Sequence, residues 1–274
     1  MKILEIPKEK FNDLISAEPD ANIYQTTNWA DYYKTMKYEP LYIGYVNDKN
    51  VYSAFATILI KNGSIFTPKT AICHGGFLIN FYDKELLQSF DRDLKKYLSK
   101  KRIKSLTIIP NVKYQTSRGN NDLLISQLHD LGYEKVDNEI QYLFSTDNIH
   151  SEDNNVFDVC VVEDDKQRDC IFKLDIKYKY IFDNLQEHVK FVVCRLNNDE
   201  RKPIVAISCI TIYKNTIIQL FTDKKMNCLY DYTKTINNKI CEITKELGCI
   251  SYISYLSNAQ SQKVELIGAF RTKI

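Results

Sequence analysis

YIGYVNDKNVYSAFATILI, at residues 42–60, has the pattern of two β-strands joined by a tight turn. Both arms are rich in β-branched and aromatic residues, and Asn47-Asp48-Lys49-Asn50 between them is typical of a hairpin turn. A second stretch, FVVCRLNNDERKPIVAISCITIY at residues 191–213, has the same pattern. The two stretches share almost no residue identities, so an arrangement of elements recurs rather than a sequence.

The elements that follow the two hairpins also recur in the same order. Each hairpin is followed by a strand, a long helix, another strand and a final strand. In the first copy these are SIFTPKT (64–70), DKELLQSFDRDLKKYLSKK (83–101), SLTIIP (105–110) and IQYLFST (140–146). In the second copy they are TIIQLFT (216–222), LYDYTKTINNKICEITKELG (229–248), ISYISYL (250–256) and VELIGAF (264–270). A helix that ends at Gly132 precedes the last strand of the first copy, and Gly268 has the matching place in the second. A period above about 100 residues is too long for a solenoid, so we expect two copies of one domain.

The order of elements predicts an α/β fold. Strands that are neighbours in sequence pair antiparallel, and the strand after each long helix can pair parallel through a right-handed crossover. We therefore expect a mixed sheet flanked by helices on both faces in each copy. The acidic stretch at residues 150–169 separates the copies and contains one candidate edge strand, VFDVCVV. The predicted domains are residues 1–150 and 151–274.

Two helical segments show apolar spacing of about one turn. In WADYYKTMKY, after the capping residues Thr26-Thr27-Asn28, the spacing predicts one buried helix face formed by Trp29, Tyr32, Tyr33 and Met36. Residues 171–186 are predicted to form one helix. Its apolar stripe consists of Ile171, Leu174, Tyr178, Ile181 and Leu185.

Composition excludes several classes of protein. Charged residues at 26% and hydrophobic residues at 44% are ordinary for a globular domain, and no apolar run approaches the ~20 residues of a membrane span. The eight cysteines contain no CxxC pair, so no metal site is expected, and a reducing cytoplasm fits best.

A basic cluster is either a phosphate-contacting patch or a helix end whose cations complement the macrodipole. Its members are Lys95, Lys96, Lys100, Lys101, Arg102 and Lys104.

Four segments, in this order, resemble a known family. Tyr24-Gln25-Thr26-Thr27-Asn28-Trp29, followed by Lys34, is similar to the F-x-Q-x-x-x-W opening of the FemA/FemB/FemX peptidyltransferases. The run from Cys73 to Ile79 (CHGGFLI) occupies the place of their Y-G-G-P or P-R-G-P loop. The end of the second long helix, KELGC at residues 245–249, and LIGAF at residues 266–270 are similar to the later motifs of that family.

The resemblance implies two tandem domains of the GNAT (GCN5-related N-acetyltransferase) fold. It also implies transfer of an amino acid from aminoacyl-tRNA to an amine of a peptidoglycan precursor. Substrate-binding residues would then be Lys34, Gln25, His74, Gly75 and Gly76, with a lysine for anionic groups and glycines where backbone approaches a ligand. Histidine can titrate near neutral pH, so His74 is a candidate base or phosphate contact, although a lone histidine in a loop is more often neither. No catalytic residue is assigned.

Several departures from the family keep a second hypothesis open. The stretch after Phe221, Thr222-Asp223-Lys224-Lys225-Met226-Asn227, has no glycine to cradle a pyrophosphate, so no coenzyme A or other cofactor is expected. Tyr252 and Ile253 stand in the family's D-F slot, so an aspartate is lost, and the family's lysine-bearing G-L-Y-x-F-K run is reduced to Ala259-Gln260-Ser261-Gln262-Lys263. The alternative is therefore a catalytically silent relative of the same fold that binds a ligand or partner. A coenzyme A-dependent acetyltransferase using only the first copy is a third possibility.

Overall fold

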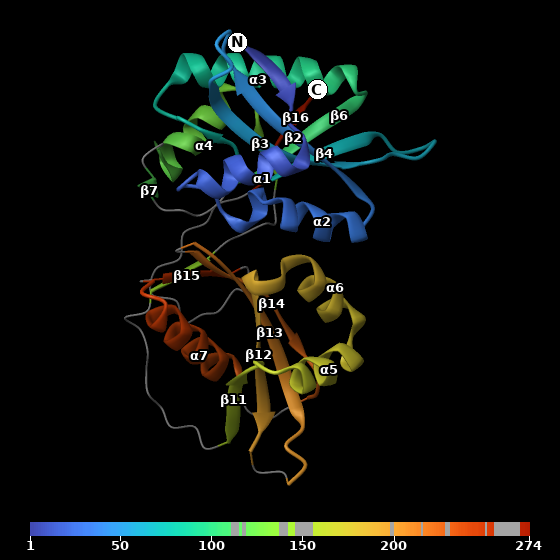
Figure 1. Cartoon of the computed structure of the whole chain (residues 1–274), viewed down its shortest axis with the longest axis vertical. Helices are drawn as coiled ribbons and strands as arrows, with labels where there is room; N and C mark the ends of the chain where they lie inside the picture. The colour runs from blue at the N-terminus through green and yellow to red at the C-terminus, as the bar shows by residue number, and fades with distance from the viewer. Residues whose placement is uncertain are drawn as a thin grey trace. The chain divides into compact units, whose positions relative to one another are not determined.

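The computed structural model describes residues 1–110, 115–116, 119–136, 142–145, 156–197, 200–214, 216–227, 231–249, 251–254 and 269–274. The chain divides into two compact units, each built from strands and helices (Figure 1). Unit 1 comprises Met1–Ile140 and Ile267–Ile274, and unit 2 comprises Gln141–Leu266. No helix among these residues is long and apolar enough to cross a membrane.

Unit 1 contains a mixed sheet and four α-helices among the described residues. Its strands are β1 (Lys2–Glu5), β2 (Tyr38–Val46), β3 (Tyr52–Lys61), β4 (Lys69–Gly75), β5 (Leu78–Ile79), β6 (Ile103–Pro110), β9 (Glu134–Val136) and β16 (Ala269–Lys273), with a separate pair β7 (Gln115–Thr116) and β8 (Gly119–Asn120). Its helices are α1 (Lys8–Ala17), the 3₁₀ helix η1 (Ile23–Gln25), α2 (Thr27–Thr35), α3 (Lys84–Lys100) and α4 (Asn121–Asp130).

The strands of unit 1 lie in the order β1-β2-β3-β4-β6-β16-β9, with β5 paired to β3. Strands β4 and β6 are parallel, whereas the other neighbours in this sheet are antiparallel. Helix α3 connects the two parallel strands, as the sequence predicts. Unit 1 is therefore a mixed sheet.

Unit 2 repeats this plan. Its strands are β10 (Tyr142–Ser145), β11 (Phe157–Val161), β12 (Val189–Leu196), β13 (Ile204–Tyr213), β14 (Thr216–Lys224) and β15 (Ser251–Ser254), and its helices are α5 (Asp165–Leu174), α6 (Ile176–Leu185), the 3₁₀ helix η3 (Gln186–His188) and α7 (Thr233–Glu246). The strand order is β10-β15-β14-β13-β12-β11, and β14 and β15 are the parallel pair. Two helices separate the edge strand from the hairpin in both units. The predicted repeat of one mixed-sheet fold is confirmed.

The last strands of the two units are exchanged, which the sequence does not predict. The strand expected to complete the first copy, β10, pairs antiparallel with β15 of unit 2. The strand expected to complete the second copy, β16, lies between β6 and β9 of unit 1. Phe270 of β16 is fully buried in the core of unit 1, and this burial favours the exchanged position. Gly268 lies outside the described residues.

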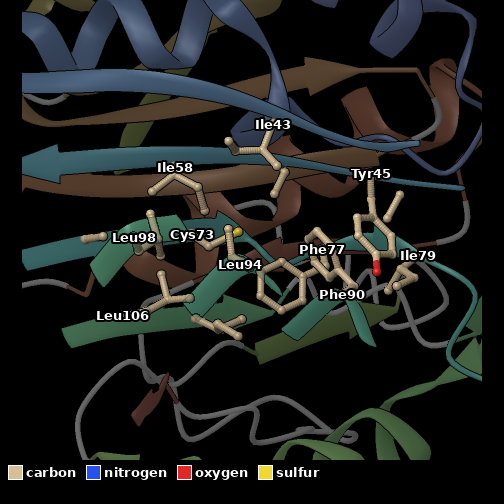
Figure 2. Close-up of a cluster of buried hydrophobic side chains, with 14 of the residues drawn as sticks. Ile43, Tyr45, Ile58, Cys73, Phe77, Ile79, Phe90, Leu94, Leu98 and Leu106 are labelled. Carbon is tan, nitrogen blue, oxygen red and sulfur yellow. The ribbon is translucent and has the colours of Figure 1, made fainter. Parts of the chain in front are cut away.

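The core of unit 1 lies between the sheet and helices α3 and α4. Leu87, Phe90, Leu94 and Leu98 repeat every three or four residues along α3 and are each at most 1% exposed. Figure 2 shows Phe90, Leu94 and Leu98 against side chains of the strands, which include Ile43, Ile58 and Cys73. Side chains alternate along a strand, so Tyr42 points to the other face. There it stacks on Phe11 of α1 at 4.8 Å between ring centroids.

Two helix predictions need correction. The segment at residues 171–186 is not one helix, because Asp175 is extended (φ −160°). Its carboxylate accepts from the N–H of Lys177 and so caps α6, which begins at Ile176. Leu174, at the end of α5, is consequently 51% exposed. Helix α2 buries Trp29, but it ends at Thr35, so Met36 lies beyond the helix and is 41% exposed.

Candidate functional site

A turn of three residues ends β4 and is the centre of the candidate site. We call His74, Gly75 and Gly76 the His-Gly-Gly turn. Strand β4 runs parallel to β6 up to the pairing of Gly75 with Pro110, so the turn lies at the carboxyl end of the parallel pair. Ligands of open α/β sheets bind at this end. Both glycines have left-handed backbone, with φ of +83° and +75°.

The side chain of Gln25 fixes this turn from η1. Its amide nitrogen donates to the carbonyl oxygens of Gly75 and Gly76, each at 3.1 Å, and its amide oxygen accepts from the N–H of Asn22 at 3.0 Å. Gln25 is 2% exposed, and the hydroxyl of Thr57 in β3 donates to the backbone carbonyl oxygen of Gln25 at 2.7 Å. Gln25 therefore acts on the shape of the turn through the backbone.

The ring of His74 is held among aromatic side chains. It stacks on Tyr24 at 3.9 Å between centroids, with an angle of 6° between the rings, and meets the edge of Trp29 at 5.4 Å. Nδ1 lies 3.4 Å from the hydroxyl of Tyr33. Burial lowers the pKa of His74 to about 3. The ring is therefore neutral at neutral pH, which argues against the option of a titrating base.

Lys34 lies at the end of α2, next to Tyr33, which contacts His74. Its ammonium is 2.6 Å from one oxygen of Asp31, and Lys8 is 2.6 Å from the other oxygen. Burial raises the pKa of Asp31, but the hydrogen bonds from Lys34 and Lys8 outweigh this effect and the net pKa is lowered. The structure thus brings Gln25, His74, Gly75 and Gly76 together in one cluster and places Lys34 in an ion pair on the surface of the adjoining helix.

Unit 2 has a polar cluster at the position that corresponds to the turn. Strand β14 pairs with β15 at Ile218 and Gln219, and a bulge interrupts its pairing with β13 immediately afterwards. Beyond the bulge, Asp223 accepts from the Tyr178 hydroxyl at 2.7 Å and from the Lys177 ammonium at 2.5 Å. The ammonium of Lys225 is 3.9 Å from the same carboxylate.

The two ammonium groups of the cluster face two carboxylates, because Lys177 is also 3.8 Å from Asp175. An anionic group that binds here would therefore compete with these carboxylates for the two lysines. Sequence reasoning did not find the cluster, because Lys177 and Tyr178 are 45 residues or more from Asp223. The only local signal is a run of charged residues directly after a strand. Beside it, Ser208, Gln219 and Thr222 share hydrogen bonds of 2.9 to 3.1 Å. The edge of unit 2 is therefore richer in polar groups than the sequence suggests.

Two lysines of the basic cluster at the end of α3 form ion pairs within unit 1. Lys95 pairs with the buried carboxylate of Asp91 at 2.8 Å and lies over the ring of Tyr133. Lys101 pairs with Glu5 at 2.6 Å. The described residues contain no group of three His, Cys, Asp or Glu side chains that could hold a metal ion.

Fold and site together define a class. Two mixed sheets, each with a parallel pair whose carboxyl ends carry glycines or polar side chains, form the fold of the tandem GNAT acyltransferases. Within that class, the FemAB family profile matches residues 6–143, which is half of the chain. The chain belongs to the FemAB family and is an acyltransferase of the Fem type. No curated protein matches the sequence.

Solved structures agree with the fold over the whole chain. FemX is 12% identical with a TM-score of 0.68, and the match covers 100% of this chain and 98% of FemX. A tandem GNAT protein from the clavulanic acid biosynthesis pathway is 8% identical with a TM-score of 0.59, over 99% of this chain and 98% of that one. L-PGS from Bacillus licheniformis is 11% identical with a TM-score of 0.56, over 97% and 91%.

Proposed function

We propose that this protein transfers an aminoacyl group from aminoacyl-tRNA to an amine of a peptidoglycan precursor in the cytoplasm. The FemAB family match supports the reaction class. In this reaction the neutral amine attacks the ester carbonyl carbon, a C–N bond forms, and the C–O bond to the tRNA ribose breaks. The proton lost by the amine ends on the ribose oxygen, so atoms and charges balance without a cofactor.

The observation that carries the proposal is the His-Gly-Gly turn. Two consecutive left-handed glycines at the end of a parallel strand pair present backbone rather than side chains to a ligand. Gln25 holds their carbonyl groups inward. We propose this turn, with Lys34 on the adjoining helix, as the binding site for the anionic acceptor.

Charge supports the division of roles between the two units. Lys34 is 48% exposed along its side chain, so its ammonium can reach a diphosphate or carboxylate of the acceptor. In unit 2, Lys177 and Lys225 are cations that suit phosphates of the tRNA donor. We propose that the acceptor uses the site on unit 1 and that donor phosphates use the cluster around Asp223.

The test of the acceptor site is calorimetric titration of a nucleotide-linked muropeptide into wild type and Lys34→Ala. Loss of a hydrogen bond to a charged group should weaken binding by about 1.5–3 kcal/mol. Unfolding free energy should change by less than about 1 kcal/mol, because an exposed ion pair contributes little.

Lys84→Ala is the matched control, since Lys84 is also an exposed lysine of unit 1 paired with an aspartate, at 2.8 Å from Asp130. It should bind the muropeptide like wild type. Equal affinity of Lys34→Ala and wild type would reject Lys34 as part of the acceptor site.

A further inference from the structure

The β3–β4 hairpin of unit 1 carries two apolar side chains at its tip. Ile65 is 95% exposed and Phe66 is 93% exposed. The turn that presents them is ordered: the N–H of Ser64 donates to the carbonyl oxygen of Thr67 at 3.1 Å, and that of Thr67 donates back at 3.3 Å. The hydroxyls of Ser64 and Thr67 are also 2.9 Å apart. Figure 1 shows this hairpin reaching beyond the neighbouring strands of its sheet.

The composition of this tip is unusual for a turn. Central turn positions favour glycine, asparagine, aspartate and proline, each for a conformational reason. Isoleucine and phenylalanine offer no such advantage, and their side chains contribute to stability only when they leave water. Folding of unit 1 therefore does not account for Ile65 and Phe66, which makes the tip a candidate contact surface.

Basic residues surround the base of the hairpin. Lys61 ends β3 and Lys69 begins β4, so a lysine flanks the tip on each arm. Lys69 is paired with Ile103 at the start of the parallel strand β6, where Arg102 and Lys104 are exposed. Further exposed lysines at this end of the sheet are Lys37, Lys100 and Lys273. The nearby carboxylate of Glu39 accepts from Asn62, so cations predominate.

We propose that the hairpin tip inserts Ile65 and Phe66 into the surface of an anionic lipid bilayer, with the surrounding basic residues on the lipid headgroups. A protein partner is less well matched, because a stable interface needs about 800 Å² from each side and the apolar surface here is two side chains. A bilayer needs only a small apolar wedge and diffuse positive charge. Each Lys or Arg near an anionic surface strengthens binding about fivefold.

The test is co-sedimentation of the full chain with vesicles of phosphatidylcholine alone or mixed with phosphatidylglycerol. Wild type should bind the mixed vesicles, and binding should weaken as salt is raised. The double substitution Ile65→Ser with Phe66→Ser should weaken binding at least about tenfold. The control is Val51→Ser, because Val51 is also exposed (56%) in a hairpin turn of unit 1, at the other end of β3.

Charge is tested separately with Lys61→Glu and Lys69→Glu together, which should also weaken binding at least about tenfold. Lys49→Glu, in the turn that contains the control residue Val51, should have no effect. The depth of insertion into the bilayer is measured with the variant Phe66→Trp. On vesicle binding, the fluorescence emission of this tryptophan should shift to the blue and be quenched by brominated lipids. The native Trp29 is 4% exposed and gives a constant background.

Three results would overturn the proposal. The first is failure of wild type to bind the mixed vesicles, and the second is unchanged binding of the variant with serines at positions 65 and 66. The third is self-association of the chain that requires Ile65 and Phe66 in the absence of vesicle binding, since the tip would then contact a second copy. None of these measurements depends on the acyl donor or acceptor.

Discussion

Gly75 shows how one residue without a side chain positions the candidate site. A Cβ added at Gly75 would lie 2.6 Å from Oδ1 of Asn22 and 3.0 Å from Cβ of Tyr24. That oxygen also accepts from the N–H of Tyr24, so Asn22 cannot move away without loss of a hydrogen bond. The turn is therefore packed tightly against η1, and only glycine fits there.

Gly75→Ala should consequently cost about 2–5 kcal/mol of unfolding free energy, from left-handed strain plus overpacking. Gly132→Ala is the control, because Gly132 has a similar φ of +79° but nothing within 4 Å of an added Cβ. It should cost only about 1–2 kcal/mol. Urea unfolding of both variants measures the difference, and equal costs would show that the contact with Asn22 is unimportant.

His74 makes stability depend on pH in a direction that follows from its burial. The pKa is about 3 in the folded protein and 6.5 in the unfolded chain. Between these values the unfolded chain binds more protons, so stability is lost as pH falls. From pH 7 to pH 5 this group should remove about 2 kcal/mol of unfolding free energy.

His74→Phe keeps an aromatic ring on Tyr24 but has no proton to bind. Between pH 7 and pH 5 the unfolding free energy of this variant should fall less than that of wild type. The difference between the two decreases should be about 2 kcal/mol, which is the contribution of His74. Urea unfolding at each pH checks this. Parallel pH dependence of the two proteins would mean that His74 is protonated in the folded state, and that the aromatic cluster is open to water.

The exchanged strands β10 and β16 are the main feature at the scale of elements. β16 is hydrogen-bonded on both sides, to β6 and to β9, although well over 100 residues of chain separate it from either strand. The entropic cost of closing a loop rises only with the logarithm of its length. Burial of Phe270 can therefore offset the cost of pairing β16 with strands that are distant in sequence. Unit 1 therefore depends on the end of the chain.

Phe270→Ala should destabilise unit 1 by about 3–5 kcal/mol, the usual range for loss of a buried phenylalanine. Hydrogen exchange should speed up in β6 and β9 and remain unchanged in β14 and β15 of unit 2. Phe157→Ala is the control, because Phe157 is 7% exposed and lies in the core of unit 2. Faster exchange in β14 and β15 for Phe270→Ala would contradict the strand exchange.

Sequence periodicity predicted most elements because their apolar spacing is local. The long helix α3 begins after the capping residue Asp83, and the glycine expected to close α4, Gly132, has left-handed backbone. The strands at residues 140–146 and 264–270 were each assigned to their own copy, whereas β10 pairs with β15 of unit 2 and β16 pairs with β6 and β9 of unit 1. Spacing identifies a strand but not its neighbour. In the same way, Gln25 and the turn could be proposed from motifs, whereas the cluster around Asp223 needs the fold to bring its members together.

At the scale of the whole molecule, the two units of the repeat carry different residues at the carboxyl ends of their parallel strand pairs. Unit 1 has the glycine turn with neutral His74, and unit 2 has the charged cluster of Lys177, Tyr178 and Asp223. The stretch from Thr222 to Asn227 has no glycine, which is unlike a phosphate cradle for coenzyme A. The absence of glycine from this stretch is the physical reason to expect an aminoacyl donor rather than acetyl-CoA.

A donor assay tests this central claim most directly. The full chain is incubated with a nucleotide-linked muropeptide and either a mixture of aminoacyl-tRNAs or acetyl-CoA, and the muropeptide is analysed by mass spectrometry. The account predicts a gain of one aminoacyl residue on a peptide amine with the tRNA mixture, reduced in Lys34→Ala and not in Lys84→Ala, and no product with acetyl-CoA. Acetylation from acetyl-CoA without aminoacyl transfer would contradict it.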